Sequence, residues 1–144
     1  MLSALAEIGI HPGVMVAPVI PAINDAEIEQ ILDQSAAAGA KRAGYVVLRL
    51  PHELKTLFRD WLAEHFPERA DHVISLIRQL HGGKDYDHHF GRRQSGSGTL
   101  AKLIASRFDL ARKRFGLDEE EDRTLTTRAF RVPNRTGDQF SLFT

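Results

Sequence analysis

The chain has 144 residues, of which 42% are hydrophobic and 26% are charged, a composition that suits one globular domain with its own core. Its 19 basic and 19 acidic side chains cancel, so overall charge gives no argument for binding nucleic acid or a membrane. The absence of cysteine excludes disulfides, thiol catalysis and thiolate-bound clusters supplied by this chain. No apolar run approaches the roughly 20 residues of a membrane helix, and residues 1–7 lack the pattern of a signal peptide, so we expect a cytoplasmic protein without membrane association.

The first third of the chain has the pattern of a strand, a helix and a second strand. Near-continuous apolar runs over residues 14–20 and 44–50 are typical of buried parallel strands. The residues between them predict a helix. Ile28, Ile31 and Leu32 form an apolar stripe, Asn24 can cap the first turn with Glu27, and Gly39 suits the left-handed end of the helix. Together these segments predict one βαβ unit.

The rest of the chain is predicted to be mainly helical. Three apolar faces indicate helices; they are formed by Leu54, Leu57, Phe58, Trp61, Leu62 and Phe66, by Ala70, Val73, Ile74, Ile77 and Leu80, and, between Ser97 and Phe115, by Leu100, Leu103, Ile104, Phe108, Ala111 and Phe115. A polar, glycine-rich loop over residues 81–99 separates the last two. We expect a βαβα unit over residues 1–66, a helical extension with this loop over 67–132, and an extended tail over 133–144.

Three segments carry a resemblance to a known family: residues 17–25 (APVIPAIND), 43–51 (AGYVVLRLP) and 82–93 (GGKDYDHHFGRR). They resemble the C-terminal half of radical S-adenosylmethionine proteins of the spore-photoproduct-lyase-like, or DNA repair photolyase-like, group. The resemblance implies an α/β fold: a fragment of a partial (β/α)6 barrel with about two parallel strands, followed by a mainly helical C-terminal extension. Its two strands would correspond to the fifth and sixth strands of that barrel.

In the resembled family, a Cys-x3-Cys-x2-Cys loop in the N-terminal half holds a four-iron four-sulfur cluster, and electron transfer from it cleaves S-adenosylmethionine to a carbon radical. This chain has no cysteine. The resemblance therefore implies a truncated or split reading frame or an excised fragment, without a cluster and inactive alone. S-adenosylmethionine would bind only together with a companion chain that carries the N-terminal barrel half.

The resemblance also implies which residues lie near the cosubstrate, at the C-terminal ends of the late strands: Ala17, Pro18, Ile20, Pro21, Asn24, Tyr45 and Arg49. Arg49 is the most informative of them, because a guanidinium at the C-terminal end of a parallel strand can pair with a carboxylate or phosphate. The alternatives are that Arg49 neutralises a neighbouring glutamate or extends to solvent, and that the prolines simply end a strand.

The loop at residues 81–93 mixes cations, aromatic rings and glycines, which suits contact with a substrate or nucleic acid through Lys84, Tyr86, Arg92 and Arg93. A polar loop over the barrel ends explains it as well, because Asp85 and Asp87 halve its charge. A metal site is disfavoured, since the adjacent histidines His88 and His89 lack helical or turn spacing. No catalytic residue is predicted on this chain.

Residues 139–143 (QFSLF) are similar to the pentapeptide that binds the bacterial sliding clamp, with Phe140 in place of the usual leucine. The resemblance implies that Gln139, Phe140, Leu142 and Phe143 would make the contacts with that partner. An extended tail can bury two apolar anchors in a preformed groove at low ordering cost. The alternative is that the aromatic rings pack on the domain's own core. The sequence thus leaves two hypotheses, a fragment of a radical enzyme and a non-catalytic module that docks a DNA-repair or replication partner.

Overall fold

The computed structural model describes residues 1–83, 94–118 and 130–132. In chain order its elements are helix α1 (Leu2–Glu7), strand β1 (Gly13–Val19), the 3-10 turn η1 (Asp25–Glu27), helix α2 (Ile28–Ala37), strand β2 (Arg42–Val47), and helices α3 (Leu54–His65), α4 (Ala70–Leu80) and α5 (Gly98–Arg114). The two strands pair in parallel. The expected α/β fold with two parallel strands is therefore confirmed.

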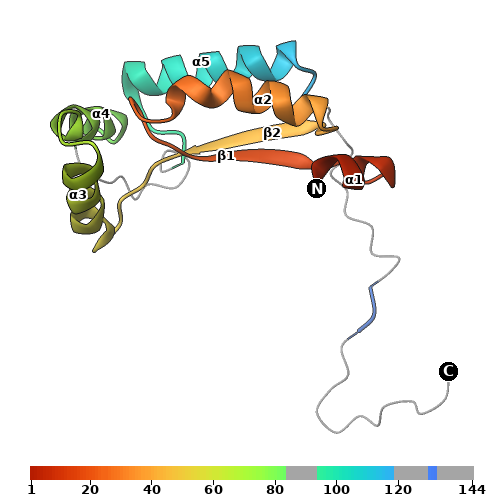
Figure 1. Cartoon of the computed structure of the whole chain (residues 1–144), viewed down its shortest axis with the longest axis horizontal. Coiled ribbons are helices and arrows are strands. Elements are labelled where there is room, and N and C mark those ends of the chain that lie inside the picture. The colour runs from red at the N-terminus through yellow and green to blue at the C-terminus, as the bar shows by residue number, and fades with distance from the viewer. Residues whose placement is uncertain (84–93, 119–129, 133–144) are drawn as a thin grey trace, which may run out of the picture.

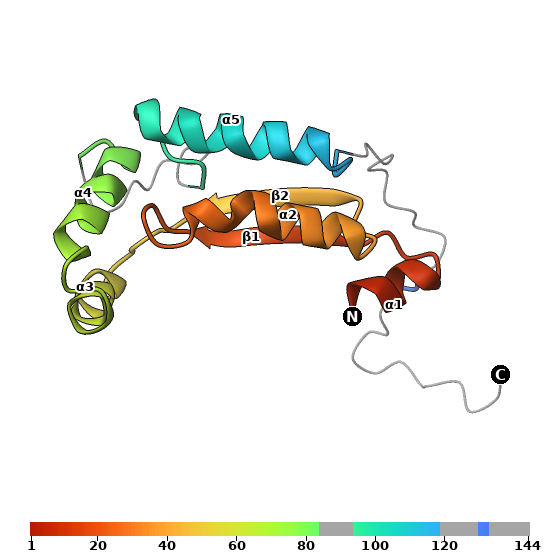
Figure 2. The same ribbon diagram turned by 45° about the horizontal axis from the view of Figure 1, so that its top comes forward.

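Helices α2 and α5 lie side by side over one face of the sheet (Figures 1 and 2). Alternate residues of β2 point to these helices, since successive side chains of a strand point to opposite faces. In β1 the register shifts between Val16 and Val19, so both of these side chains, three residues apart, reach the covered face. The buried side chains of this layer form the covered-face cluster: Val16, Val19, Val47, Ile28, Leu32, Ile104 and Phe108, with Leu80 and Leu117 at its ends. This cluster explains why the apolar stripe of α2 and the buried face of α5 were visible in the sequence.

The opposite face of the sheet carries no described helix (Figure 2). Met15 on this face is 62% exposed. Its thioether lies against Gly44, where an added Cβ would be 3.0 Å from Met15 Cε. Ala17 and Arg42 are also exposed. We call this surface the bare face.

The two edges of the sheet differ as well. At the outer edge of β2, Ala43 N donates to Leu117 O at 3.2 Å and Val47 N donates to Gln94 O at 2.8 Å, and Arg42 forms a bridge with Asp118. Among the described residues, β1 pairs with β2 alone. The segments that flank α5 thus cap the β2 edge and leave the β1 edge open within the described ranges of the chain.

Helices α3 and α4 lie beyond the C-terminal ends of the strands (Figure 1). They share a second cluster, the strand-end cluster: Leu50, Leu62, Val73, Ile74 and Ile77, with Ile20, Ala22, Ile23 and Leu48 packed against it. The expected domain boundary after residue 66 therefore falls between two helices that pack together. That boundary stays a prediction.

Several local expectations are corrected. The second strand runs over Arg42–Val47 rather than 44–50, because beyond Val47 the chain turns toward α3, and Leu48 N makes its last bond to Val19 O at 2.9 Å. Leu103 is 55% exposed, because the covered side of α5 is filled by the side chains around Ile104 and Phe108. Leu54, Leu57 and Trp61 are exposed because α3 packs chiefly on α4, through Leu62.

Candidate functional site

A shallow hollow lies at the C-terminal ends of the two strands. It has a volume of about 300 Å³, and its lining residues are Ala17, Pro18, Val46, Val47, Leu48, Arg49, Pro51 and Leu54. Three of the predicted cosubstrate residues, Ala17, Pro18 and Arg49, are thus brought together. The walls are otherwise apolar, so the hollow suits a ligand with one acidic group and an apolar or flat body.

Arg49 is the charged group of this hollow. It is half-buried, and none of the ion pairs between residues that the structure describes involves it. The alternative that Arg49 neutralises a neighbouring glutamate finds no such partner in residues 1–83 or 94–118. A guanidinium placed there can receive a carboxylate or phosphate through paired N–H groups.

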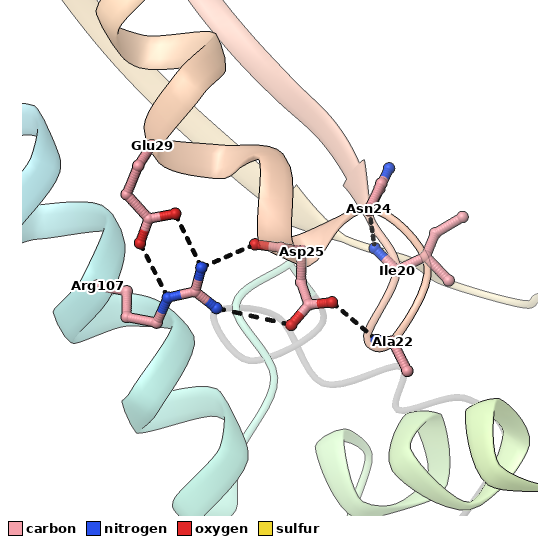
Figure 3. A network of polar contacts seen from close by, with 6 residues as sticks. All are labelled: Ile20, Ala22, Asn24, Asp25, Glu29 and Arg107. Carbon is pink, nitrogen blue, oxygen red and sulfur yellow. Dashed lines mark hydrogen bonds and ion pairs between the residues drawn. The ribbon is translucent and has the colours of Figure 1, made fainter.

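The loop after β1 is held by its own polar side chains. Asn24 Oδ1 accepts a hydrogen bond from Ile20 N at 2.7 Å (Figure 3). Asn24 Nδ2 donates to Pro18 O at 3.0 Å. The expected capping of the following helix by the Asn24 side chain is wrong, because these two bonds occupy its amide. Asn24 therefore shapes the hollow indirectly, by fixing the backbone of Pro18.

Asp25, the next residue, also holds this loop through its side chain. Its Oδ1 accepts a hydrogen bond from Ala22 N at 2.8 Å. Ala22 has a φ of 61°, a conformation that a residue with a side chain seldom adopts without support.

Two further predicted cosubstrate residues belong to this loop. Pro21 is buried and Ile20 is half-buried, and neither lines the hollow. These predicted residues serve the packing of the loop.

Arg107 of α5 joins this loop to α2 (Figure 3). Its guanidinium donates to both carboxylate oxygens of Glu29, with Nε to Oε1 at 2.9 Å and Nη2 to Oε2 at 2.8 Å. Nη2 also donates to Asp25 O at 3.0 Å, and Nη1 lies 3.6 Å from Asp25 Oδ2. Hydrogen bonding to Arg107 lowers the pKa of Glu29, and the same bond raises the pKa of Arg107. No sequence pattern indicates this network, because it links residues far apart in the chain.

Tyr45 does not join the predicted group. It faces the helix side of the sheet, where its ring centroid lies 4.7 Å from that of Phe108. There it borders a separate hollow of about 310 Å³ with Lys102 and residues 95–98 at the start of α5. Burial, followed by the charge of Asp109, raises the pKa of Tyr45. A ligand seated against Arg49 would therefore lie on the other side of the sheet from this ring.

The remaining predicted contacts lie outside the described residues. They are Lys84, Tyr86, Arg92 and Arg93 of the loop and Gln139, Phe140, Leu142 and Phe143 of the tail. Their roles toward a substrate, nucleic acid or a sliding clamp stay predictions. Over the described ranges, no cluster of three or more potential metal ligands occurs, and no helix has both the length and the apolar character needed to cross a membrane.

Sequence reasoning missed His81, which it placed in a polar loop. The structure buries this residue directly after α4, with 2% of its surface exposed. Its Nε2 lies 2.9 Å from Leu48 O, next to Arg49. The apolar stripe of α4 ends at Leu80, and a continuation of that stripe by one residue was the available signal.

The comparisons with known proteins add one relation. No family model matches the chain, and no solved structure matches it significantly. An uncharacterized protein of Mycobacterium bovis and two uncharacterized proteins of Mycobacterium tuberculosis strains are each 35% identical to it over 83 residues. That match covers 56% of this chain and 23% of each relative. The chain thus matches less than a quarter of the length of these mycobacterial relatives.

Proposed function

We propose that this chain supplies the last two strands of a radical S-adenosylmethionine barrel of the DNA repair photolyase-like group, and with them one wall of the cosubstrate pocket. The observation that carries the proposal is the hollow at the C-terminal ends of two parallel strands, where half-buried Arg49 has no ion-pair partner among the described residues. Parallel barrels place their active sites at that end of the strands.

The two faces of the sheet support the same proposal. In a barrel of parallel strands, helices cover the outside and side chains fill the inside. Here α2 and α5 cover one face, while Met15, Ala17 and Gly44 line the other without a described helix over them. The bare face and the open β1 edge are where further strands of such a barrel would pair and pack.

The cofactors implied by the resemblance fit this chain unequally. An iron-sulfur cluster does not fit, because thiolates hold such clusters and the chain has no cysteine. S-adenosylmethionine fits incompletely: Arg49 offers a cation for its carboxylate, and Pro18, Pro51 and Leu54 offer apolar walls for its adenosyl group. In a complete enzyme of the group this cosubstrate supplies the carbon radical. The proposed contribution of this chain is to bind and orient S-adenosylmethionine.

The first test is binding of S-adenosylmethionine by a reassembled barrel. The chain is co-expressed with the region of a mycobacterial relative that lies outside the matched segment, and the copurified pair is titrated with S-adenosylmethionine by calorimetry. We expect binding by the pair, and at least a tenfold loss in the variant Arg49→Met, because a charged hydrogen-bond pair is removed. Lys41→Met, which removes a cation just before β2 at the opposite end of the sheet, should bind as the unchanged pair does. Equal binding by all three pairs, or none, would refute the proposal.

The second test concerns the bare face. Met15→Glu places a charge on it, and we expect this variant to lose copurification with the companion because an unpaired carboxylate would be buried. Leu110→Glu is the matched control, since Leu110 lies on α5 and is 71% exposed. Copurification that survives Met15→Glu would show that the companion binds elsewhere.

A third test addresses the chain alone. Anaerobic reconstitution with iron and sulfide should give no cluster absorbance, and incubation with S-adenosylmethionine and a reductant should give no 5'-deoxyadenosine. Substantial amounts of either product would contradict the proposed division of labour between the two polypeptides.

A further inference from the structure

His81 occupies a fixed position at the C-terminal end of α4. Its backbone N donates to Arg78 O at 3.1 Å, and Gly83 N donates to the same oxygen at 2.7 Å. The imidazole is buried, and its Nε2 lies 2.9 Å from Leu48 O. Because a carbonyl oxygen can only accept, Nε2 carries the hydrogen and donates it.

This hydrogen bond acts on the peptide unit of Arg49. The carbonyl of Leu48 and the N–H of Arg49 belong to one planar unit, so fixing the carbonyl fixes that plane. The preceding peptide is held as well, since Leu48 N donates to Val19 O at 2.9 Å. Leu50, the next residue, is 2% exposed in the strand-end cluster. Arg49 therefore lies between anchored neighbours, and the side chain of His81 provides one of the anchors.

The other ring nitrogen of His81 makes no such contact within the described part of the chain. Nδ1 is buried and has no hydrogen-bond partner among the described residues. A buried polar atom without a partner costs free energy, which an aliphatic side chain of similar size would avoid. What an aliphatic side chain cannot supply is the donor to Leu48 O.

We propose that His81 is a positioning residue, whose bond to Leu48 O directs the Arg49 guanidinium into the hollow at the strand ends. The nature of the ligand rests on the proposed function, whereas the orientation of Arg49 does not. His81 is not itself a lining residue of the hollow, and its ring is bonded to the lining residue Leu48. It acts through the backbone.

The test compares three side chains at position 81 by nuclear magnetic resonance of the 15N-labelled full chain. His81→Gln keeps an N–H donor at the place of Nε2, and His81→Leu fills space without a donor. We expect His81→Leu to shift the backbone amide and the Nε–H resonances of Arg49, and His81→Gln to keep them near their original positions. The Nε–H of Arg107, bonded to Glu29, is the internal control and should not move in either variant.

Titration with S-adenosylmethionine, in the pair with the companion polypeptide, gives the second readout. His81→Leu should weaken binding about tenfold, the effect of one lost hydrogen bond on the placement of a charged contact, and His81→Gln should restore it. If the unchanged pair does not bind the cosubstrate but the Arg49 resonances respond as expected, the positioning role holds and the proposed function fails.

Two results would overturn the positioning role itself. One is a His81→Leu variant whose Arg49 resonances coincide with those of the unchanged chain; the other is a His81→Gln variant that behaves as His81→Leu does. If His81→Leu loses the Arg107 resonance because it unfolds, His81→Met, a less branched apolar replacement, takes its place and the same criteria apply.

Discussion

The two faces of the small sheet differ in how far their side chains are buried. On the covered face, Val16 and Val47 are 7% and 0% exposed beneath α2 and α5. On the bare face, Met15, a neighbour of Val16 in the chain, is 62% exposed. Apart from Arg42, neither face of the strands carries a charged residue, so the sequence alone does not show which face is covered.

This difference indicates that the covered face stabilises the chain, whereas the bare face is where we propose that binding occurs. The covered-face cluster buries the side chains that hold β1, β2, α2 and α5 together, and burial of apolar surface is the main favourable term in folding. The bare face contributes little of that burial. Along with the Arg49 hollow, it is the surface that we propose binds a further polypeptide and a ligand.

The largest effect should come from the centre of the covered face. Phe108 is 3% exposed and packs on Tyr45, so Phe108→Ala should lower the free energy of unfolding by about 3–4 kcal/mol. Leu110→Ala, two residues along the same helix at a site that is 71% exposed, should change it by less than about 0.5 kcal/mol. Urea unfolding followed by circular dichroism measures both. Similar losses in the two variants would mean that α5 does not pack as described.

The neighbours Val16 and Met15 test the comparison of faces directly. Val16→Ala should cost about 1–3 kcal/mol, because it leaves a cavity beneath α2 and α5. Met15→Ala, although it removes more atoms, should cost less than about 0.5 kcal/mol in the chain alone. The same unfolding measurement decides between them. A larger loss for Met15→Ala would show that the bare face is covered in the chain alone.

The network around Arg107 should have a smaller effect. Arg107→Met removes the paired contact with Glu29 and the bond to Asp25 O, and we expect a loss of about 1–2 kcal/mol, limited because these side chains are partly exposed to water. Lys113→Met on the same helix should lower the free energy of unfolding by only a few tenths of that amount. Added salt should reduce the difference in unfolding free energy between the two variants. A difference that does not respond to salt would indicate that Arg107→Met loses packing rather than charge pairing.

The smallest effect concerns pH. Because Arg107 lowers the pKa of Glu29 below its ordinary 4.5, this pair contributes in full above about pH 4.5, and its contribution is lost as the pH falls through the lower folded value. The unfolding free energy of the unchanged chain should therefore fall more steeply below pH 4.5 than that of Arg107→Met. Parallel curves for the two proteins would show that Glu29 and Arg107 are not paired in solution.

Three of the seven residues that the resemblance implies near the cosubstrate line the hollow, and the other four are placed elsewhere for physical reasons. Ala17, Pro18 and Arg49 meet because the C-terminal ends of parallel strands lie at one edge of a sheet. The resemblance implies that Tyr45 lies with them, but the alternation of side chains puts it on the helix side with Phe108. The local sequence pattern predicts a helix cap at Asn24, but it does not indicate that the side chain bonds backward along the chain, to Ile20 N and Pro18 O.

By itself, the sequence determined the parallel βαβ unit, the apolar faces of α2 and α4, and the absence of cluster-binding thiolates, because periodicity and composition are local properties of a chain. Tertiary structure decided which face of the sheet is covered, that Arg107 holds Glu29 and Asp25 across 78 and 82 residues, and that His81 reaches Leu48 across 33. Such contacts depend on how layers stack, and a one-dimensional pattern does not encode which distant polar groups that stacking brings within hydrogen-bond distance.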